Sequence, residues 1–176
     1  MKWIYLKSID STNNFAKRLI KNNKITTDTV IIAEKQSRGK GTKGRKWYSD
    51  DPGGLYFSYI AINQIQISKD PKNFVLNIGK EIAKALGDSS KENIYLEWPN
   101  DLMINKKKCG GILTEYYKKD NEYIIIGIGI NINQSNFPAN LKYSATSLKI
   151  ENQKEYNIIN IVKTLSEQIN NYLNKR

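Results

Sequence analysis

The stretch CGGILTEYYKKDNEYIIIGIGININ, residues 109–133, decides the fold of this chain. It holds two runs, Cys109–Tyr117 and Glu122–Asn133, whose aromatic and β-branched residues are typical of β-strands. Between them, the polar residues 118–121, KKDN, are suited to a tight turn. We therefore expect an antiparallel hairpin.

Further elements are predicted outward from this hairpin. Strands are expected at Trp3–Leu6, Thr29–Ala33, Leu55–Ile62, Ile94–Trp98 and Leu102–Ile104, with turns at 48–54 and 105–107. Helices are expected after the N-cap residue Ser11, from Asp70-Pro71 to Gly87, and from Ile158 to Leu173, each with an apolar stripe. Residues 134–145 are expected to form a loop. These elements predict a single α+β domain over residues 1–176, with a mixed, mainly antiparallel sheet packed against helices.

The composition restricts the class of protein. No apolar run approaches the roughly 20 residues that cross a bilayer, and the N-terminal residues lack the apolar core of a signal peptide. The single cysteine, Cys109, has no partner for an internal disulfide, which favours a cytoplasmic location. The absence of histidine excludes a Ser-His catalytic pair and a histidine-ligated metal.

The net charge of +11 is compatible with a nucleic-acid partner. Most of the lysines, however, lie far apart in the sequence, which favours a lysine-rich solvated surface. Charge is concentrated only in Lys35–Lys46 and Lys106–Lys108. These two segments are therefore more informative than the total.

The first segment, QSRGKGTKGRKW at residues 36–47, combines three glycines with several cations. Glycine allows positive φ and close approach to a ligand, and consecutive amides can form an anion-binding concavity. The pattern Gly39-x-Gly41-x-x-Gly44 matches the dinucleotide fingerprint, but that fingerprint needs a helix directly afterwards. Residues 45–54, RKWYSDDPGG, cannot sustain one, and they lack the Lys-Ser/Thr of a P-loop. A basic loop over an anion remains as the interpretation.

The second segment, EWPNDLMINKKKCGGIL at residues 97–113, places Asp101 seven residues before Lys108. A turn, Trp98-Pro99-Asn100-Asp101, precedes the lysine, and Gly110-Gly111 follows it. One carboxylate and one lysine beside a basic loop predict a nucleotide-using active site.

Five motifs follow one another in a fixed order along the chain: SIDSTNNFAK (8–17), QSRGKGTKGRKW (36–47), EWPNDL (97–102), KCGGIL (108–113) and GIGININ (127–133). Together they resemble the catalytic domain of the biotin protein ligases over roughly residues 9–148. The resemblance implies the fold of the biotin and lipoate ligases and a two-step reaction. Biotin and ATP form biotinyl-5′-AMP, and a lysine of a biotin carboxyl carrier protein then takes the biotin and releases AMP. It also implies Mg²⁺ arriving with ATP, no metal site built by the protein, and a homodimer.

The resemblance assigns roles to individual residues. Lys108, Lys40 and Arg45 match catalytic cations that offset the charge of two reacting anions, and Asp101 matches the acid that accepts the proton of the attacking amine. The residues that match biotin-binding positions are Ser11, Thr12, Asn13, Gln36, Gly39, Lys40, Lys108, Gly111 and Gly127. Those that match nucleotide-binding positions are Arg45, Trp47, Asn100 and Asn131. Gly127 and Gly129 lie inside a strand, which indicates close approach of a ligand or another backbone.

Other readings stay open at this point. A lipoate–protein ligase would share the fold and the chemistry, although the Trp-Pro-Asn-Asp and Gly-Ile-Gly-Ile-Asn segments favour biotin. A degenerate biotin-binding protein or a basic nucleic-acid module would not need the Lys108 and Asp101 pair. Neither an N-terminal helix-turn-helix domain nor a C-terminal β domain is expected, so specific DNA binding is not expected.

Three residues depart from the family pattern. Lys40 and Thr42 stand where the loop Gly-Arg-Gly-Arg-x-Gly-Arg of the family has its first two arginines. Lysine lacks the guanidinium fork and threonine lacks the charge, so we expect a weaker grip on the adenylate. Glu97 replaces a lysine that the family prefers before Trp-Pro-Asn-Asp.

Overall fold

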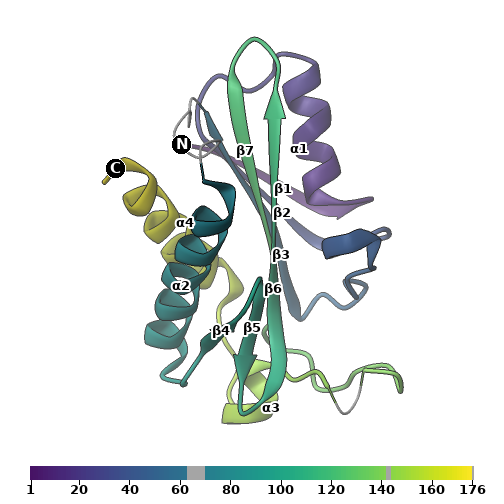
Figure 1. Cartoon of the computed structure of the whole chain (residues 1–176). Coiled ribbons are helices and arrows are strands. Elements are labelled where there is room, and N and C mark those ends of the chain that lie inside the picture. The colour runs from purple at the N-terminus through teal and green to yellow at the C-terminus, as the bar shows by residue number, and fades with distance from the viewer. Residues whose placement is uncertain (63–69, 142–143, 176) are drawn as a thin grey trace.

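The computed structural model describes residues 1–62, 70–141 and 144–175. Within them, seven strands form one sheet in the order β1-β2-β3-β7-β6-β5-β4 (Figure 1). The strands are β1 (Lys2–Ile9), β2 (Thr29–Gln36), β3 (Gly54–Ile62), β4 (Tyr95–Glu97), β5 (Asp101–Ile104), β6 (Lys107–Lys118) and β7 (Glu122–Asn131). Strands β1 and β2 pair in parallel, and the other neighbours are antiparallel. The predicted α+β class with a mixed, mainly antiparallel sheet is confirmed.

The predicted hairpin is the pair β6 and β7, in register from Gly110↔Ile130 to Lys118↔Glu122. Strand β7 is buried on both faces, because alternate residues belong to two separate cores. A strand covered on both faces has a nearly continuous apolar sequence, which explains the isoleucine run. The strand ends at Asn131, two residues before the predicted end.

Helices cover the two faces unequally (Figure 1). Helices α2 (Pro71–Ser90) and α4 (Ile158–Asn174) pack on one face, and α1 (Thr12–Lys21) packs on the other. The prediction that Gly87 ends α2 is wrong, since the helix continues to Ser90 and ends at Lys91 with φ of 63°. Gly87 instead makes room for the chain that leaves the helix: a Cβ there would lie 3.0 Å from the Glu92 carbonyl oxygen.

The connections that shape the site are short. Asn105 and Lys106 both have positive φ, 47° and 64°, as a two-residue hairpin turn between β5 and β6 requires. The predicted loop 134–145 is confirmed for its described residues; positions 142–143 lie outside them. The five-residue helix α3 (Leu148–Asn152) was not predicted, because it is too short to show periodicity.

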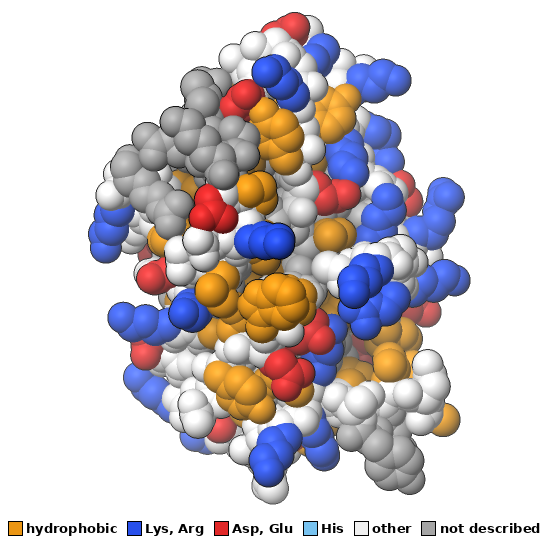
Figure 2. Space-filling model, in the orientation of Figure 1, with side chains coloured by type: hydrophobic (Ala, Val, Ile, Leu, Met, Phe, Trp, Pro, Cys, Tyr) orange, Lys and Arg blue, Asp and Glu red, His pale blue; other side chains and the backbone are white. Residues whose placement is uncertain are grey.

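The surface carries the positive charge in a dispersed form. Lysine and arginine side chains are spread over the visible face and are interleaved with acidic ones (Figure 2). None of the helices in the described part of the chain has the length and apolar character needed to cross a membrane.

Candidate active site

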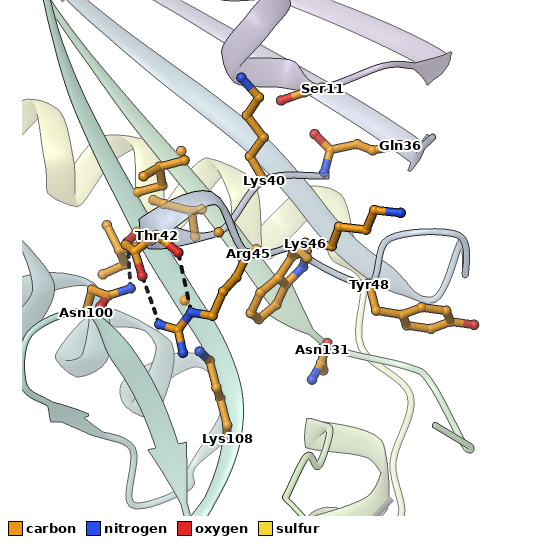
Figure 3. A pocket seen from close by; sticks show the side chains of 18 of the residues that line it. Ser11, Gln36, Lys40, Thr42, Arg45, Lys46, Tyr48, Asn100, Lys108 and Asn131 are labelled. Atoms are coloured by element: carbon orange, nitrogen blue, oxygen red, sulfur yellow. Dashed lines mark hydrogen bonds between the residues drawn. The ribbon is translucent and has the colours of Figure 1, made fainter. Parts of the chain in front are cut away.

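A pocket of about 280 Å³ lies between the start of α1, the glycine-rich loop (residues 36–47) and strands β6 and β7. Most of the site residues predicted from the sequence line it: Ser11, Thr12, Asn13, Gln36, Lys40, Arg45, Trp47, Asn100, Lys108, Gly111, Gly127 and Asn131. Figure 3 shows Ser11, Gln36 and Lys40 at one end of the pocket, which is called the α1 end below. Asn100, Lys108 and Asn131 lie at the other, here the Lys108 end.

The α1 end is a buried hydrogen-bonded turn. Ser11 caps α1 by accepting a hydrogen bond from the backbone N–H of Asn14, as its position before the apolar stripe predicted. The Thr12 backbone N–H and hydroxyl both donate to Gln36 Oε1, at 2.8 and 3.2 Å. Because the oxygen of Gln36 is used in this way, its amide nitrogen is the group that can serve a ligand, together with the hydroxyl proton of Ser11.

Glycines in the central strands make room for side chains that lie across the sheet. A Cβ at Gly127 would overlap the side-chain amide of Asn13. At Gly129 a Cβ would lie 2.5 Å from Trp47 Nε1, and at Gly111 it would lie 3.1 Å from the same indole ring. The predicted close approach therefore involves the protein's own side chains, with Trp47 lying across the cross-strand pair Gly111 and Gly129.

The Lys108 end holds the predicted carboxylate and lysine together. Lys108 Nζ donates to Asp101 Oδ1 at 2.6 Å and lies 5.4 Å from the centre of the Trp47 ring. Asp101 itself does not line the pocket, so it reaches the site through this contact. The side chains of both residues are about a quarter exposed, which keeps the pair reachable by a ligand.

The backbone around Lys108 is fixed from two sides. Strand β5 pairs Met103 with Lys108 on one side. On the other, the Lys108 N–H donates to the Ser144 carbonyl at 2.9 Å, and the Thr146 N–H donates to the Lys108 carbonyl at 2.9 Å. The main chain of Lys108 is therefore held on both sides, and only its side chain is free to rotate toward another partner.

Two buried amides complete the wall at this end. Asn100 Nδ2 donates to the Ile112 carbonyl at 3.1 Å, and Asn131 Nδ2 donates to the Thr146 carbonyl at 2.9 Å. Their nitrogens donate to the backbone, so the Asn100 oxygen is the group available to a ligand, whereas Asn131 Oδ1 already accepts from Gln134 Nε2 at 3.4 Å. Cys109, next to Lys108, is fully buried, and burial raises the pKa of its thiol to about 12. It is therefore a packing residue and not a nucleophile.

The glycine-rich loop is folded on itself around the short helix η1 (Thr42–Gly44). The Gly41 N–H donates to the Arg45 carbonyl at 2.8 Å, and the Trp47 N–H donates to the Gly39 carbonyl at 3.0 Å. The expected concavity of free amides is thus reduced, because these amides are used within the loop. Attraction for an anion falls instead on the side chains of Lys40 and Arg45. The Arg45 guanidinium also donates to the Thr42 hydroxyl and carbonyl, at 3.0 and 3.3 Å (Figure 3).

Gly39 does not line the pocket. A Cβ there would lie 2.6 Å from the Trp47 carbonyl oxygen and would overlap the Ser49 hydroxyl. Its place is underneath the loop, where it lets the two arms of the loop approach each other.

Several lining residues were not predicted. Phe137, Leu141, Ser144 and Ala145 reach the pocket from the segment after β7. The large apolar side chains of Phe137 and Leu141 are the signal that could have pointed to this loop, since such side chains need a surface to cover.

Comparison with known proteins identifies the family. The model of the biotin/lipoate A/B protein ligase family matches residues 5–131, well over half of the chain. The chain belongs to this family. In this member of the family, the five motifs found in the sequence lie within the matched residues or directly beside them, and they meet at one pocket.

Individual relatives agree with this assignment. The chain is 38% identical over 151 residues to the bifunctional ligase/repressor BirA of Bacillus spizizenii, an alignment that covers 82% of this chain and 45% of that protein. This chain thus spans about half the length of that relative. Its structure is similar to the biotin protein ligase from Aquifex aeolicus in complex with biotin and ATP, with a TM-score of 0.85, 33% identity, and coverage of 99% and 71%. LipL1 of P. falciparum in complex with lipoate shares the fold alone, with a TM-score of 0.59 and 16% identity over 98% of this chain and 61% of that one.

Proposed function

We propose that the chain is an ATP-dependent biotin protein ligase. A carboxylate oxygen of biotin attacks the α-phosphorus of ATP, which forms biotinyl-5′-AMP and releases pyrophosphate. The ε-amine of a lysine on a biotin carboxyl carrier protein then attacks the mixed anhydride, which forms an amide and releases AMP and a proton. The observation that best supports the proposal is a pocket with neutral hydrogen-bonding groups beside Lys40 at its α1 end and the Lys108–Asp101 pair at the other end.

The α1 end suits the ureido ring of biotin. A ureido group presents one carbonyl acceptor and two N–H donors, and buried polar groups of this kind need partners. The Ser11 hydroxyl and the Gln36 amide nitrogen supply donors, and the Thr12 hydroxyl oxygen supplies an acceptor. The dithiolane ring of lipoate carries neither an N–H nor a carbonyl, so it would leave these groups unpaired.

The first step needs cations, because it joins two anions. Lys108, Arg45 and Lys40 all line the pocket and carry the charge that offsets repulsion between carboxylate and phosphate. Lys108 is bonded to Asp101, so an incoming carboxylate or phosphate competes for the same ammonium group. When the Lys108 ammonium group exchanges Asp101 for the substrate as its partner, the Asp101 carboxylate is released.

The second step uses the released carboxylate. A lysine amine attacks only when neutral, whereas its ordinary pKa is ~10.4. In this proposal Asp101 orients the attacking amine and accepts its proton. Mg²⁺ would enter as part of the ATP substrate, since dedicated protein cages for this ion are uncommon. The carrier protein as acceptor, a homodimer and a cytoplasmic location belong to the same proposal.

Biotin-dependent exchange of labelled pyrophosphate into ATP tests the proposal, with lipoate as the parallel substrate. We expect exchange with biotin alone, and its loss in Lys108→Ala. Exchange with lipoate would assign the chain to the lipoate branch of the family. Binding of biotin without any exchange would instead indicate a degenerate biotin-binding protein.

A further inference from the structure

The side-chain amide of Asn13 is seated on three strands of the sheet. Ser58, Gly127 and Leu113 form one row across β3, β7 and β6 in the strand register. Ser58 Oγ donates to Asn13 Oδ1 at 2.6 Å, and Asn13 Nδ2 donates to the Leu113 carbonyl at 3.4 Å. Gly127 lies between them, and its missing Cβ leaves the space that Asn13 occupies. Asn13 is only 3% exposed, and the hydrogen bonds of its side-chain amide are made with residues of the sheet.

Glu115 on β6 joins this seat to the helix. Its Oε2 accepts from Asn13 Nδ2 at 2.9 Å, and its Oε1 accepts from Lys17 Nζ at 2.6 Å. Asn13 and Lys17 are four residues apart on α1, so they lie on the same face of the helix. One carboxylate therefore attaches the first and second turns of α1 to the sheet.

The carboxylate also decides how the amide of Asn13 is oriented. An ionised carboxylate only accepts hydrogen bonds, so the nitrogen of Asn13 must face Glu115 and its oxygen must face Ser58. Lys17 Nζ forms an ion pair with the other oxygen of Glu115 at 2.6 Å. A neutral amide in place of Glu115 could pair with either end of Asn13, so that only the longer bond to the Leu113 carbonyl would still favour the observed orientation.

We infer that Glu115 is a positioning residue for biotin, acting through Asn13 on the turn Ser11–Thr12. This inference rests on the proposed function. Glu115 does not line the pocket, so it does not touch the substrate. It fixes the residue that directly follows Ser11 and Thr12, and those two residues face the pocket. A small displacement of such positioning groups costs affinity for the group they hold, while the Lys108 end is unaffected.

The test is Glu115→Gln, which keeps the size of the side chain and removes its charge. The loss of one oriented buried hydrogen bond predicts an increase of about ten-fold in the KM for biotin, with the KM for ATP and the kcat at saturating biotin within about two-fold. Pyrophosphate exchange gives both KM values, and calorimetric titration with biotin should show the same factor in Kd. Ser58→Ala removes the other bond of Asn13 and should give the same selective effect. Lys118→Gln, on the same strand, loses only a surface ion pair with Glu122 and should behave as the wild type.

Two results would overturn the positioning role. One is an unchanged KM for biotin in both Glu115→Gln and Ser58→Ala. The other is a parallel rise of both KM values with a lowered melting temperature, since that pattern indicates general loosening of the fold. Failure of the wild-type protein to bind biotin in the same titration is a different result, which would overturn the proposed function before any variant is measured.

Discussion

The two ends of the pocket are built on different principles. At the α1 end, Ser11, Thr12 and Asn13 are buried, and their polar groups have partners in the sheet or in Gln36. At the Lys108 end, Arg45 is exposed and Lys108 is half-buried, and the central contact is an ion pair that a ligand can replace. Preorganised neutral groups give recognition, whereas exchangeable charges give chemistry. Substitutions at the two ends should therefore separate binding of biotin from reaction.

The largest effect is expected from Lys108→Ala. Removing a cation from a site where charge develops lowers rates by about two to three orders of magnitude. We expect a loss of that size in pyrophosphate exchange, with biotin binding weakened far less because the α1 end is intact. Lys107→Ala is the control, since that lysine is adjacent and exposed. A loss of less than ten-fold would mean that Lys108 does not carry the first step.

Asp101→Asn should affect the two steps of the reaction differently. Pyrophosphate exchange should stay within a few-fold of the wild type, while transfer to the carrier lysine should fall about 100-fold, as loss of a general base does. Single-turnover transfer from preformed biotinyl-5′-AMP measures the second half. Glu97→Gln is a matched control, because Glu97 lies directly across from Asp101 on β4 and is exposed. Nothing in the structure explains why a glutamate stands there. Equal losses in both halves would indicate that Asp101 acts only by holding Lys108.

Two glycines on β7 allow the sharpest comparison of the ends. Gly127→Ala would displace Asn13, and Gly129→Ala would displace Trp47, although the sites are two residues apart on one strand. Forced overpacking of this kind costs about 1–3 kcal/mol. We expect the first variant to raise the KM for biotin and the second to raise the KM for ATP, each about ten-fold. The same change in both constants for both variants would contradict the division of the pocket.

A smaller effect is expected from restoring an arginine in the glycine-rich loop. Thr42→Arg adds a guanidinium that can pair with phosphate in a bidentate manner, so release of the adenylate should slow a few-fold. Rapid separation of free biotinyl-5′-AMP from the protein measures this rate. Lys43→Arg, in the next position and outside the pocket lining, controls for a guanidinium that does not face the site. An unchanged release rate in Thr42→Arg would show that the loop does not retain the intermediate.

The smallest effect concerns the anchoring of α1 from outside the pocket. Arg18 donates to both oxygens of Asp10, at 2.9 and 2.7 Å, and these bonds hold the pKa of Asp10 well below its usual value. A pKa lower in the folded than in the unfolded state stabilises the fold above the ordinary value of ~3.9, and the contribution is lost as the pH falls below it. Asp10→Asn should therefore cost about 1 kcal/mol of unfolding free energy at pH 7 and less at pH 3. Urea unfolding at both pH values measures this; a difference that does not shrink at pH 3 would contradict the assignment. Glu155→Gln is the control, since the Glu155 side chain is 75% exposed in its ion pair with Lys149.

Much of the sheet could be predicted because its signals are local. The β6–β7 hairpin, the turn at Asn105–Lys106 and the helix cap at Ser11 each depend on residues close in sequence. The Lys108–Asp101 contact was predictable for the same reason, since the two residues are seven apart across one hairpin. Gly87 misled the prediction because its role, close approach of a later carbonyl, is a tertiary one.

The rest of the site depends on contacts between distant segments. Glu115 contacts Asn13 although the two residues are 102 positions apart in the sequence, and Ser58 contacts Asn13 across a separation of 45 positions. No pattern along the chain connects such residues, so their relation appears only once the strands are in register. The glycines show the same limit: their spacing predicted close approach, but not that Asn13 and Trp47 are the groups that approach.

The single cysteine has a practical consequence. The sulfur of Cys109 is buried within β6, directly beside Lys108, and the raised pKa of the thiol keeps it protonated at physiological pH. A thiol reagent can modify it only when this strand opens locally. The rate of labelling therefore reports the opening of the strand that carries the reactive lysine, without any engineered probe or any other thiol in the chain to confuse the signal.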